Sequence, residues 1–322
     1  MTEDEKKKLE KAINKMICAD CVDKMKRLPR NSIDLGITSL PKEVNKKKLK
    51  EFKNKIICGD CVDKMKLLPR NSVDLVVTSP PYGFLRDYIG FKFRFEKIAR
   101  ELFRVIKPGG VLVWVVGDFV LGTGLGKSCT PERQLLFFND RAGFTVHDKM
   151  IFKKNSPSSP IREEYNTRYQ QVFENMYILS KGPLKTFNPI KDRKVKYNGS
   201  LAKGSHRMKN GELRQYTKKN KPPKEYDLRY NVWTGCDCAE CKYAEESNNG
   251  NVFTYLTGGW GMSSSDKIAK DHPAIGPEML AYDLIYTYTN ENEIVLDPMC
   301  GSGTTLKMAK ILNRKYIGID VS

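Results

Sequence analysis

The chain has 322 residues and a formal net charge of +18. This length fits one large α/β domain with an insertion, or two ordinary domains. The positive charge predicts a polyanionic partner, and nucleic acid is favoured over membrane because no apolar run approaches the roughly 18 to 20 residues that span a bilayer. The first residues lack the apolar stretch of a secretory signal, so we expect a cytoplasmic protein.

The N-terminal quarter of the chain is a tandem duplication. Residues 7–41 and 47–81 align at an offset of 40, with 24 of 35 positions identical. Each copy reads as strand, short helix and strand, which predicts a β-α-β unit and a parallel sheet. Residues 1–46 are therefore interpreted as a degenerate repeat copy that is dispensable for chemistry.

The nine cysteines are expected to be reduced thiols, because their number is odd and no secretion signal is present. Cys18/Cys21 and Cys58/Cys61 have the spacing of zinc half-sites, but the duplication explains them as one motif copied. A second cluster, Cys236, Cys238 and Cys241, offers three thiols that could bind zinc together with His206. Its spacing is irregular for a closed four-ligand site, so no metal is predicted.

The second repeat copy ends in the first chemical motif. An apolar run at 73–77 leads directly into Thr78-Ser79-Pro80-Pro81-Tyr82. A hydroxyl, a rigid carbonyl and an aromatic ring thus follow a buried strand, where α/β proteins build ligand crevices. These groups suit a flat ring that carries an amine. The first copy ends in Ser39-Leu40-Pro41-Lys42 and lacks the aromatic residue.

The segment after this motif continues the α/β pattern. We expect an amphipathic helix that is closed by Lys107-Pro108-Gly109-Gly110 and followed by a strand. Two later strands are expected to form an antiparallel edge pair. The expected elements are a helix at 93–105, a strand at 111–116, a helix at 130–142 and strands at 144–153 and 172–180.

The composition changes abruptly at residues 185–224, where thirteen Lys or Arg stand against Asp192 and Glu212. Most such charge runs are solvated loops. Here aromatic and amide side chains that can stack and hydrogen-bond are interleaved with the charges, as in nucleic-acid-binding surfaces. We therefore predict a nucleic-acid-binding insertion. The interleaved residues are Phe187, Tyr197, Asn198, Gln215 and Tyr216.

The second chemical motif lies near the C-terminus. A strand at 293–297 leads through Gly301-Ser302-Gly303 into a helix that is expected to end near 312. Glycines in such a turn let the backbone approach a ligand closely, as in nucleoside-cofactor loops. A further strand at 316–319 ends in Asp320, whose carboxylate can accept hydrogen bonds from ribose hydroxyls. No phosphate loop for a triphosphate is present.

Together these motifs resemble the β-class amino-methyltransferases of DNA, in which the catalytic half precedes the cofactor half. Gly59-Asp60, the 107–110 motif and His272-Pro273-Ala274 stand in the family's order. The resemblance implies a circularly permuted, Rossmann-like, S-adenosylmethionine-dependent methyltransferase fold. It divides the chain into a repeat copy (1–46), a catalytic half (47–184), a basic target-recognition insertion (185–265) and a cofactor-binding half (266–322).

The resemblance also implies roles for individual residues. Ser79, Pro80, Pro81 and Tyr82 would hold and activate a base flipped out of duplex DNA. S-adenosyl-L-methionine would be the methyl donor, and a cognate restriction endonuclease is a candidate partner. The residues implied in cofactor binding are Asp60, Cys61, His272, Asp297, Pro298, Gly301, Ser302, Gly303, Thr304, Thr305 and Asp320.

Two features of the sequence narrow the choice of the atom that is methylated. Cytosine-C5 methylation uses a cysteine beside a proline, commonly Pro-Cys, and the sequence contains no such dipeptide. Within the family, Ser before Pro-Pro-Tyr favours N4 of cytosine, whereas Asp or Asn is typical of N6 of adenine. N6-adenine methylation, an RNA or protein methyltransferase, and a catalytically inactive nucleic-acid-binding protein remain the alternatives.

The sequence differs from the family's pattern in the position of one helix. Members usually continue into a helix after the strand that here ends at Asp320. We expect segment 42–55, or its copy 6–15, to occupy that position, because the missing helix would connect the same two strands in an unpermuted fold.

Overall fold

The computed structural model describes nine ranges of the chain: 49–81, 93–120, 126–154, 168–169, 171–195, 203–217, 225–235, 254–255 and 277–321. By its internal contacts the chain divides into Met1–Asn45 and Lys46–Ser322. The first unit, with the degenerate repeat copy, lies outside the described ranges. All nine described ranges belong to the second unit.

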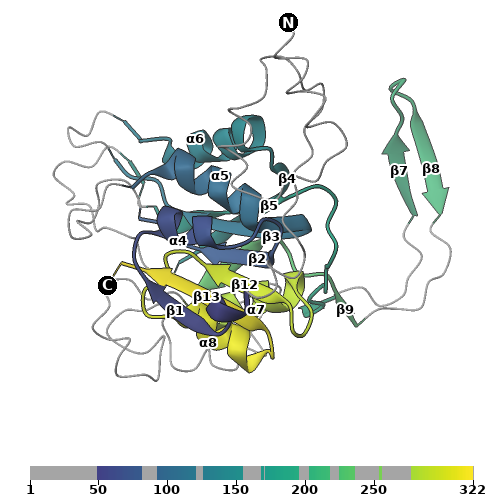
Figure 1. Ribbon diagram of the computed structural model, residues 1–322. Coiled ribbons are helices and arrows are strands. Elements are labelled where there is room, and N and C mark those ends of the chain that lie inside the picture. Colours follow the sequence, from purple (N-terminus) through teal and green to yellow (C-terminus); the bar gives the residue numbers. More distant parts are fainter. Residues whose placement is uncertain are drawn as a thin grey trace, which may run out of the picture. The chain divides into compact units, whose positions relative to one another are not determined.

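One nine-stranded sheet forms the centre of this unit, in the order β1-β13-β12-β2-β3-β5-β4-β10-β11 (Figure 1). The first five strands are mutually parallel, as the β-α-β pattern predicts. Their bounds are β1 (Lys55–Cys58), β13 (Lys315–Asp320), β12 (Ile294–Asp297), β2 (Val73–Thr78) and β3 (Ile106–Val116). The remaining strands are β5 (Phe173–Ser180), β4 (Thr145–Lys153), β10 (Val232–Gly235) and β11 (Thr254–Tyr255).

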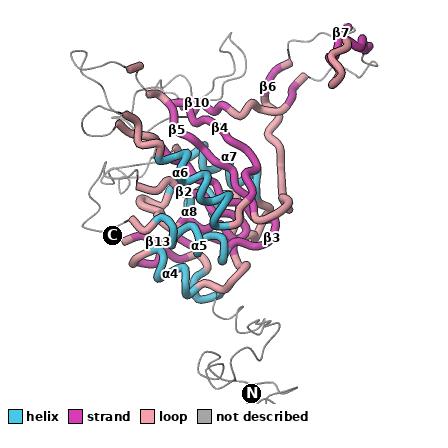
Figure 2. The backbone as a smooth tube through the Cα atoms, turned by 90° about the horizontal axis from the view of Figure 1, so that it is seen from above, coloured by secondary structure: helices cyan, strands magenta, loops and turns pink. Residues whose placement is uncertain are grey.

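Helices cover both faces of the sheet because strand side chains alternate between two apolar clusters. Val76, Leu112 and Trp114 face one cluster, where α4 and α5 lie side by side (Figure 2). Leu75 and Val113 face the other, which contains side chains of α7 and α8. Parallel sheets normally require such cover on both faces. The helices are α4 (Cys61–Leu67), α5 (Phe95–Val105), α6 (Thr130–Phe137), the π-helix η1 (Phe138–Ala142), α7 (Glu278–Tyr288) and α8 (Thr304–Ile311).

A buried carboxylate ties the strands of the two chemical motifs together. Asp74 of β2 accepts a hydrogen bond from the Ile294 amide of β12 at 2.9 Å. It also pairs with Lys107 of β3, whose Nζ lies 2.7 Å from Oδ2. Asp74 therefore links three adjacent strands although its partners lie far apart in sequence.

Most expected elements are confirmed within one or two residues, with two corrections. The strands at 144–153 and 172–180 do pair antiparallel, but not at an edge, because β5 lies between β3 and β4 and β4 also pairs with β10. The 107–110 motif belongs to β3 itself, which begins at Ile106 opposite Val73 and shifts register before Val111. Helix α7 was not predicted.

The segment before β1 lies next to β13, in agreement with the expectation for residues 42–55. Residues 49–52 are helical, and Leu49 and Phe52 pack against the cluster that contains Ile317 and Ile319. The Asn54 amide then donates to the Tyr316 carbonyl at 2.7 Å, where the β1–β13 pairing begins. The copy at 6–15 lies outside the described residues.

The basic segment contains more regular structure than its composition indicates. β7 (Lys203–Arg207) pairs with β8 (Leu213–Thr217), and β6 (Arg193–Lys194) pairs with β9 (Tyr226–Asp227), both antiparallel. Across the described ranges, every helix is too short or too polar to span a membrane.

Candidate active site

The site lies where the strand order reverses, between β12 and β2. From β12 the chain continues to β13 on one side, whereas from β2 it continues to β3 on the other. The two strands pair in parallel, with Val295 opposite Leu75 and Leu296 opposite Val76. Ligands of open α/β sheets bind at the carboxyl ends of strands at such a point. The two sequence motifs, more than two hundred residues apart, therefore meet at one edge.

Four polar residues mark the carboxyl ends of four adjacent strands in spatial order. Asp60 follows β1, Asp320 ends β13, Asp297 ends β12 and Ser79 follows β2. Parallel pairing places these strand ends along the same edge of the sheet (Figure 1). Three carboxylates and a hydroxyl thus form one row, and this row combines the predicted cofactor and catalytic residues.

The turn after β12 has the open backbone that a close ligand approach requires. Gly301 and Gly303 have φ values of +47° and +83°, a region that favours glycine. The Gly301 amide donates to Asp320 Oδ2 at 2.7 Å, and the Cys300 amide donates to the Ile319 carbonyl at 3.0 Å. Helix α8 begins directly after Gly303, so its N-terminal amides face the same region as this turn.

Close packing beneath the turn also depends on glycine. A Cβ on Gly318 of β13 would lie 2.4 Å from Leu306 Cδ1 and 3.0 Å from Cys300 Sγ. A side chain at position 318 would therefore require Leu306, and to a smaller extent Cys300, to move.

Asp297 is a buried carboxylate of the site with a raised pKa. Burial raises the pKa of this carboxyl to about 6, although the Thr305 and Thr78 hydroxyls and the Met299 amide oppose the rise. The Met299 amide donates to Oδ1 at 3.2 Å. The Thr78 hydroxyl lies beside the carboxyl but makes no hydrogen bond of regular geometry within the described residues, and its oxygen is buried. A desolvated carboxylate and an unsatisfied hydroxyl suit a cationic, hydrogen-bonding ligand.

Asp60 is held at the first turn of α4. Its Oδ1 accepts hydrogen bonds from the Val62 and Asp63 amides at 2.9 and 3.2 Å and also pairs with Arg94. Asp60 thus acts as a helix N-cap, a role that sequence spacing alone does not separate from ligand binding. Arg94 was not predicted, and nothing in the sequence indicates that it would reach across from the start of α5.

The predicted catalytic motif is described up to Pro81. Ser79 is exposed, whereas Pro80 is buried and Pro81 half-buried, and the two prolines restrict the backbone after Ser79. Thr78, which was not among the predicted site residues, points toward Asp297 instead. Tyr82 and His272 lie outside the described residues, and their predicted roles are untested.

The cysteines of the site are poorly suited to nucleophilic chemistry. Burial, with Asp60 nearby, raises the pKa of Cys61 to about 12. Burial and the neighbouring Asp297 and Asp320 have the same effect on Cys300. Because the thiolate is the reactive form, both residues are unreactive near neutral pH. The described part of the chain holds four cysteines, all unbonded: Cys58, Cys61, Cys129 and Cys300.

The remaining predicted cofactor residues surround the turn. Pro298 is buried behind Asp297, and Thr305 is buried in the first turn of α8. Ser302 Oγ and Thr304 Oγ1 lie 3.4 Å apart at the mouth of the turn. Among the described residues, no three His, Cys, Asp or Glu side chains group as metal ligands do. Cys236, Cys238 and Cys241 fall outside those residues.

The fold and this edge bring the glycine turn after β12, the predicted cofactor loop, beside Ser79-Pro80-Pro81, the predicted catalytic motif. The family model described as DNA methylase, that of the N6 and N4 amino-methyltransferases, matches residues 73–322. The chain belongs to this family. It is a DNA amino-methyltransferase by descent, as its motifs predict.

Individual relatives agree with this assignment. The chain is 46% identical over 246 residues to the orphan methyltransferase M.BamHII of Bacillus amyloliquefaciens, covering 76% of this chain and 82% of that protein. It is 24% identical to the type II methyltransferase M.HinfI of Haemophilus influenzae, covering 96% of this chain and 65% of that protein. Among solved structures, the cytosine-N4-specific PvuII DNA methyltransferase shares the fold with a TM-score of 0.55 and 17% identity, covering 83% of this chain and 82% of that one.

Proposed function

We propose that this protein transfers a methyl group from S-adenosyl-L-methionine to the exocyclic N4 of cytosine in duplex DNA. The observation that carries the proposal is the juxtaposition of Ser79, at the end of β2, with Asp297, at the end of the adjacent strand β12. One residue belongs to the amine-binding motif and the other to the cofactor loop. Transfer between two bound molecules requires both at one site.

The residues of the turn suit the cofactor. Its methionine end carries an ammonium and a carboxylate beside a sulfonium. Asp297 offers a buried carboxylate for positive charge, and the start of α8 at Thr304 and Thr305 offers amides for negative charge. Gly301 and Gly303 leave room for the cofactor to approach the backbone, and Pro298 and Ser302 complete the turn. Asp320 lies at the strand end assigned to the ribose, and Asp60 lies at the strand end assigned to the adenine. When bound, S-adenosylmethionine supplies an electrophilic methyl group.

The catalytic residues act on the base. The lone pair of an exocyclic amine is delocalised into the ring, so the amine is a weak nucleophile. The Ser79 hydroxyl and the Pro80 carbonyl accept its hydrogens and favour a tetrahedral nitrogen with an available lone pair. Pro81 holds this backbone in place, and Tyr82 stacks on the flipped base, which costs a few kcal/mol to extrude. Positioning and electrostatics then drive direct transfer.

Cytosine is favoured over adenine by Ser79, because Asp or Asn is typical at this position of adenine-specific relatives. Methylation at C5 is disfavoured because the buried Cys61 and Cys300 have thiol pKa values near 12. Double-stranded DNA is the macromolecular substrate, and the protein works in the cytoplasm where chromosomal DNA is accessible. A cognate restriction endonuclease is a candidate partner.

Nucleoside analysis tests the proposal. Genomic and synthetic duplex DNA are incubated with labelled S-adenosylmethionine and digested to nucleosides, with structured RNA as a parallel substrate. Label in N4-methylcytosine from DNA is the expected result. Label in N6-methyladenine would show that the target base is adenine rather than cytosine, while the protein would still be a DNA amino-methyltransferase. Label only in RNA, or no transfer despite cofactor binding, would refute the proposal.

A further inference from the structure

The β7–β8 hairpin is a regular element inside the basic segment. Its strands pair from Lys203 opposite Thr217 to Arg207 opposite Leu213. At the tip, the Gly211 amide donates to the Met208 carbonyl at 2.9 Å and the Met208 amide to the Glu212 carbonyl at 2.8 Å. Gly211 has φ +88°, as expected for a three-residue turn that closes with a bulge. The sequence therefore specifies this hairpin through its turn.

The hairpin is exposed on both faces and positively charged. All residues from 205 to 215 are exposed, including Leu213 at 62% and Met208 at 40%. Residues 203–217 contain four basic residues (Lys203, Arg207, Lys209, Arg214) and one acidic residue (Glu212), so their net charge is +3. An isolated two-stranded hairpin is marginal in water, so contact with a partner of opposite charge would stabilise it.

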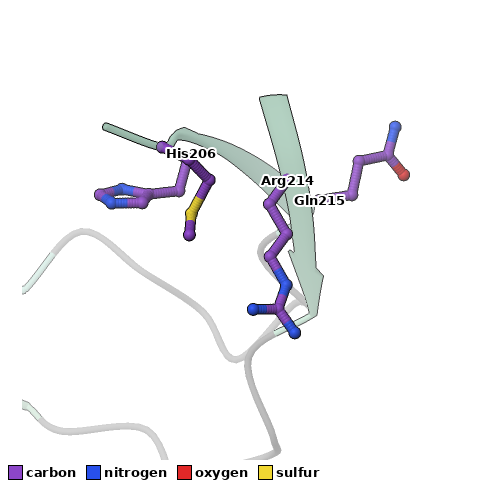
Figure 3. Close-up of a pocket in the computed structure, with 4 residues that line it drawn as sticks. His206, Arg214 and Gln215 are labelled. Atoms are coloured by element: carbon purple, nitrogen blue, oxygen red, sulfur yellow. The ribbon is translucent and has the colours of Figure 1, made fainter. Parts of the chain in front are cut away.

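Three polar side chains of the hairpin have no polar partner among the described residues. His206 lies opposite Arg214 across the strands, whereas Gln215 lies opposite Ser205. Figure 3 shows His206 and Gln215 projecting in opposite directions from the hairpin. In the part of the chain that is described, the side chains of Arg214, His206 and Gln215 make no hydrogen bond or ion pair.

By contrast, other arginines in this part of the chain make ion pairs or hydrogen bonds within the protein. Arg229 pairs with Asp283 of α7 at 2.6 Å and with Asp192. Arg193 pairs with Asp227 at 3.1 Å. Arg207 donates to the Gly211 carbonyl at 3.3 Å and so supports the turn. Among the described residues, contacts within the chain thus account for Arg229, Arg193 and Arg207 but not for Arg214.

We propose that the β7–β8 hairpin lies in the major groove of the DNA substrate and that Arg214 and His206 read base edges there. The identity of the partner rests on the proposed function. A two-stranded ribbon fits the B-DNA major groove, about 12 Å wide and about 8.5 Å deep. Strands of five residues extend about 17 Å, which matches about five base pairs. The deep, narrow major groove of duplex RNA does not admit side chains, so DNA is the occupant.

The chemistry of Arg214 favours guanine. A guanidinium donates two parallel hydrogen bonds to O6 and N7 of guanine, and no other base presents both acceptors. A lysine retains the charge but loses the planar fork. Arg214→Lys therefore separates base reading from attraction to phosphate. Arg207→Lys is the control, because it makes the same change on the same hairpin at the next register pair, opposite Leu213, where side chains alternate to the other face.

Sequence selection by the full-length protein tests this inference without requiring catalysis. Wild type, R214K, R207K and H206A are each mixed with a randomised duplex library, and the bound molecules are sequenced. Wild type and R207K should enrich the same motif. R214K should lose preference at one guanine by about tenfold or more, and H206A should relax an adjacent position. Equal thermal melting of all four proteins confirms folding.

Two outcomes would overturn the inference. One is an identical motif for R214K, H206A and wild type, which would assign base reading elsewhere. The other is the absence of any sequence enrichment by the wild type. Methylation is measured separately by nucleoside analysis. If no methyl transfer were found, the selection experiment would still show whether the hairpin reads DNA sequence.

Discussion

The Gly301 amide donates a hydrogen bond to Oδ2 of Asp320 at 2.7 Å. This bond joins the glycine turn after β12 to the end of the neighbouring strand β13. Asp320 is therefore a positioning residue for the turn, in addition to its predicted contact with ribose. A carboxylate at this place fixes the backbone that is expected to meet the cofactor.

Replacing Asp320 by Ala should weaken cofactor binding. The change removes a hydrogen bond to a charged acceptor, worth about 1.5 to 3 kcal/mol, so affinity for S-adenosylmethionine should fall about tenfold to a hundredfold. Calorimetric titration measures the loss. Asp140→Ala, an exposed aspartate on η1, is the control and should bind like wild type. Equal affinities for D320A and wild type would show that the turn does not depend on this bond.

Asp297→Asn should stabilise the protein while impairing cofactor binding. The folded-state pKa of Asp297, about 6, lies above the ordinary value of 3.8, so this group favours folding most at low pH and loses that contribution as pH rises through 6. Removing the charge should therefore raise the free energy of unfolding by about 3 kcal/mol at pH 7.5 and by about 1 kcal/mol at pH 4.5. Urea unfolding at both pH values checks the difference.

The same titration should appear in ligand binding. If the ionised Asp297 holds the cofactor's positive charge, wild-type affinity should decrease as pH falls below about 6. D297N should bind weakly at every pH. A wild-type affinity that is flat between pH 5 and 8 would argue against contact between this carboxylate and the cofactor.

Asp74→Ala should destabilise the fold because it leaves the Ile294 amide and Lys107 without their buried acceptor. We expect a loss of about 1 to 3 kcal/mol, since Asp74 is buried but Lys107 is partly exposed. Denaturant unfolding measures it. Lys66→Ala, which breaks an exposed ion pair with Asp63, should change stability by less than about 0.5 kcal/mol. Similar values for the two variants would contradict the proposed link between β2, β3 and β12.

A substitution of Lys209, at the tip of the β7–β8 hairpin, tests whether the hairpin contacts DNA phosphates. Lys209→Ala should weaken binding to all duplex sequences equally and reduce the slope of log affinity against log salt by about 0.9, because one phosphate contact is lost. Fluorescence anisotropy at several salt concentrations gives the slope. Lys66→Ala, on α4, should leave it unchanged. A sequence-dependent effect of K209A would assign this residue to base reading instead.

The main elements of the site were predictable because they are local. The apolar run before Ser79 and the glycine turn after Asp297 each specify a strand end within a few residues. The duplication identified a β-α-β unit, and hence the parallel order around β2. The family resemblance then joined two motifs that no local pattern connects.

Other features depend on long-range packing and could not be predicted. The β5–β4 pair lies inside the sheet because β10 extends the sheet beyond β4, and β10 comes from a segment whose composition resembles a loop. Arg94 reaches Asp60, and Thr78 faces Asp297, only after the helices and strands have assembled. The β7–β8 hairpin of the basic segment is closed by the turn at Gly211 rather than marked by apolar alternation.

The most direct test of the central claim is single-turnover methyl transfer to duplex DNA by Ser79→Ala, with cofactor affinity measured on the same protein. We expect S79A to bind S-adenosylmethionine within about twofold of the wild-type affinity and to transfer methyl about a hundredfold or more slowly, because one acceptor at the reacting amine is lost. Ser72→Ala, at the other end of β2, should transfer methyl at the wild-type rate once folded. Transfer by S79A at the wild-type rate would contradict the assignment of this edge of the sheet as the catalytic site.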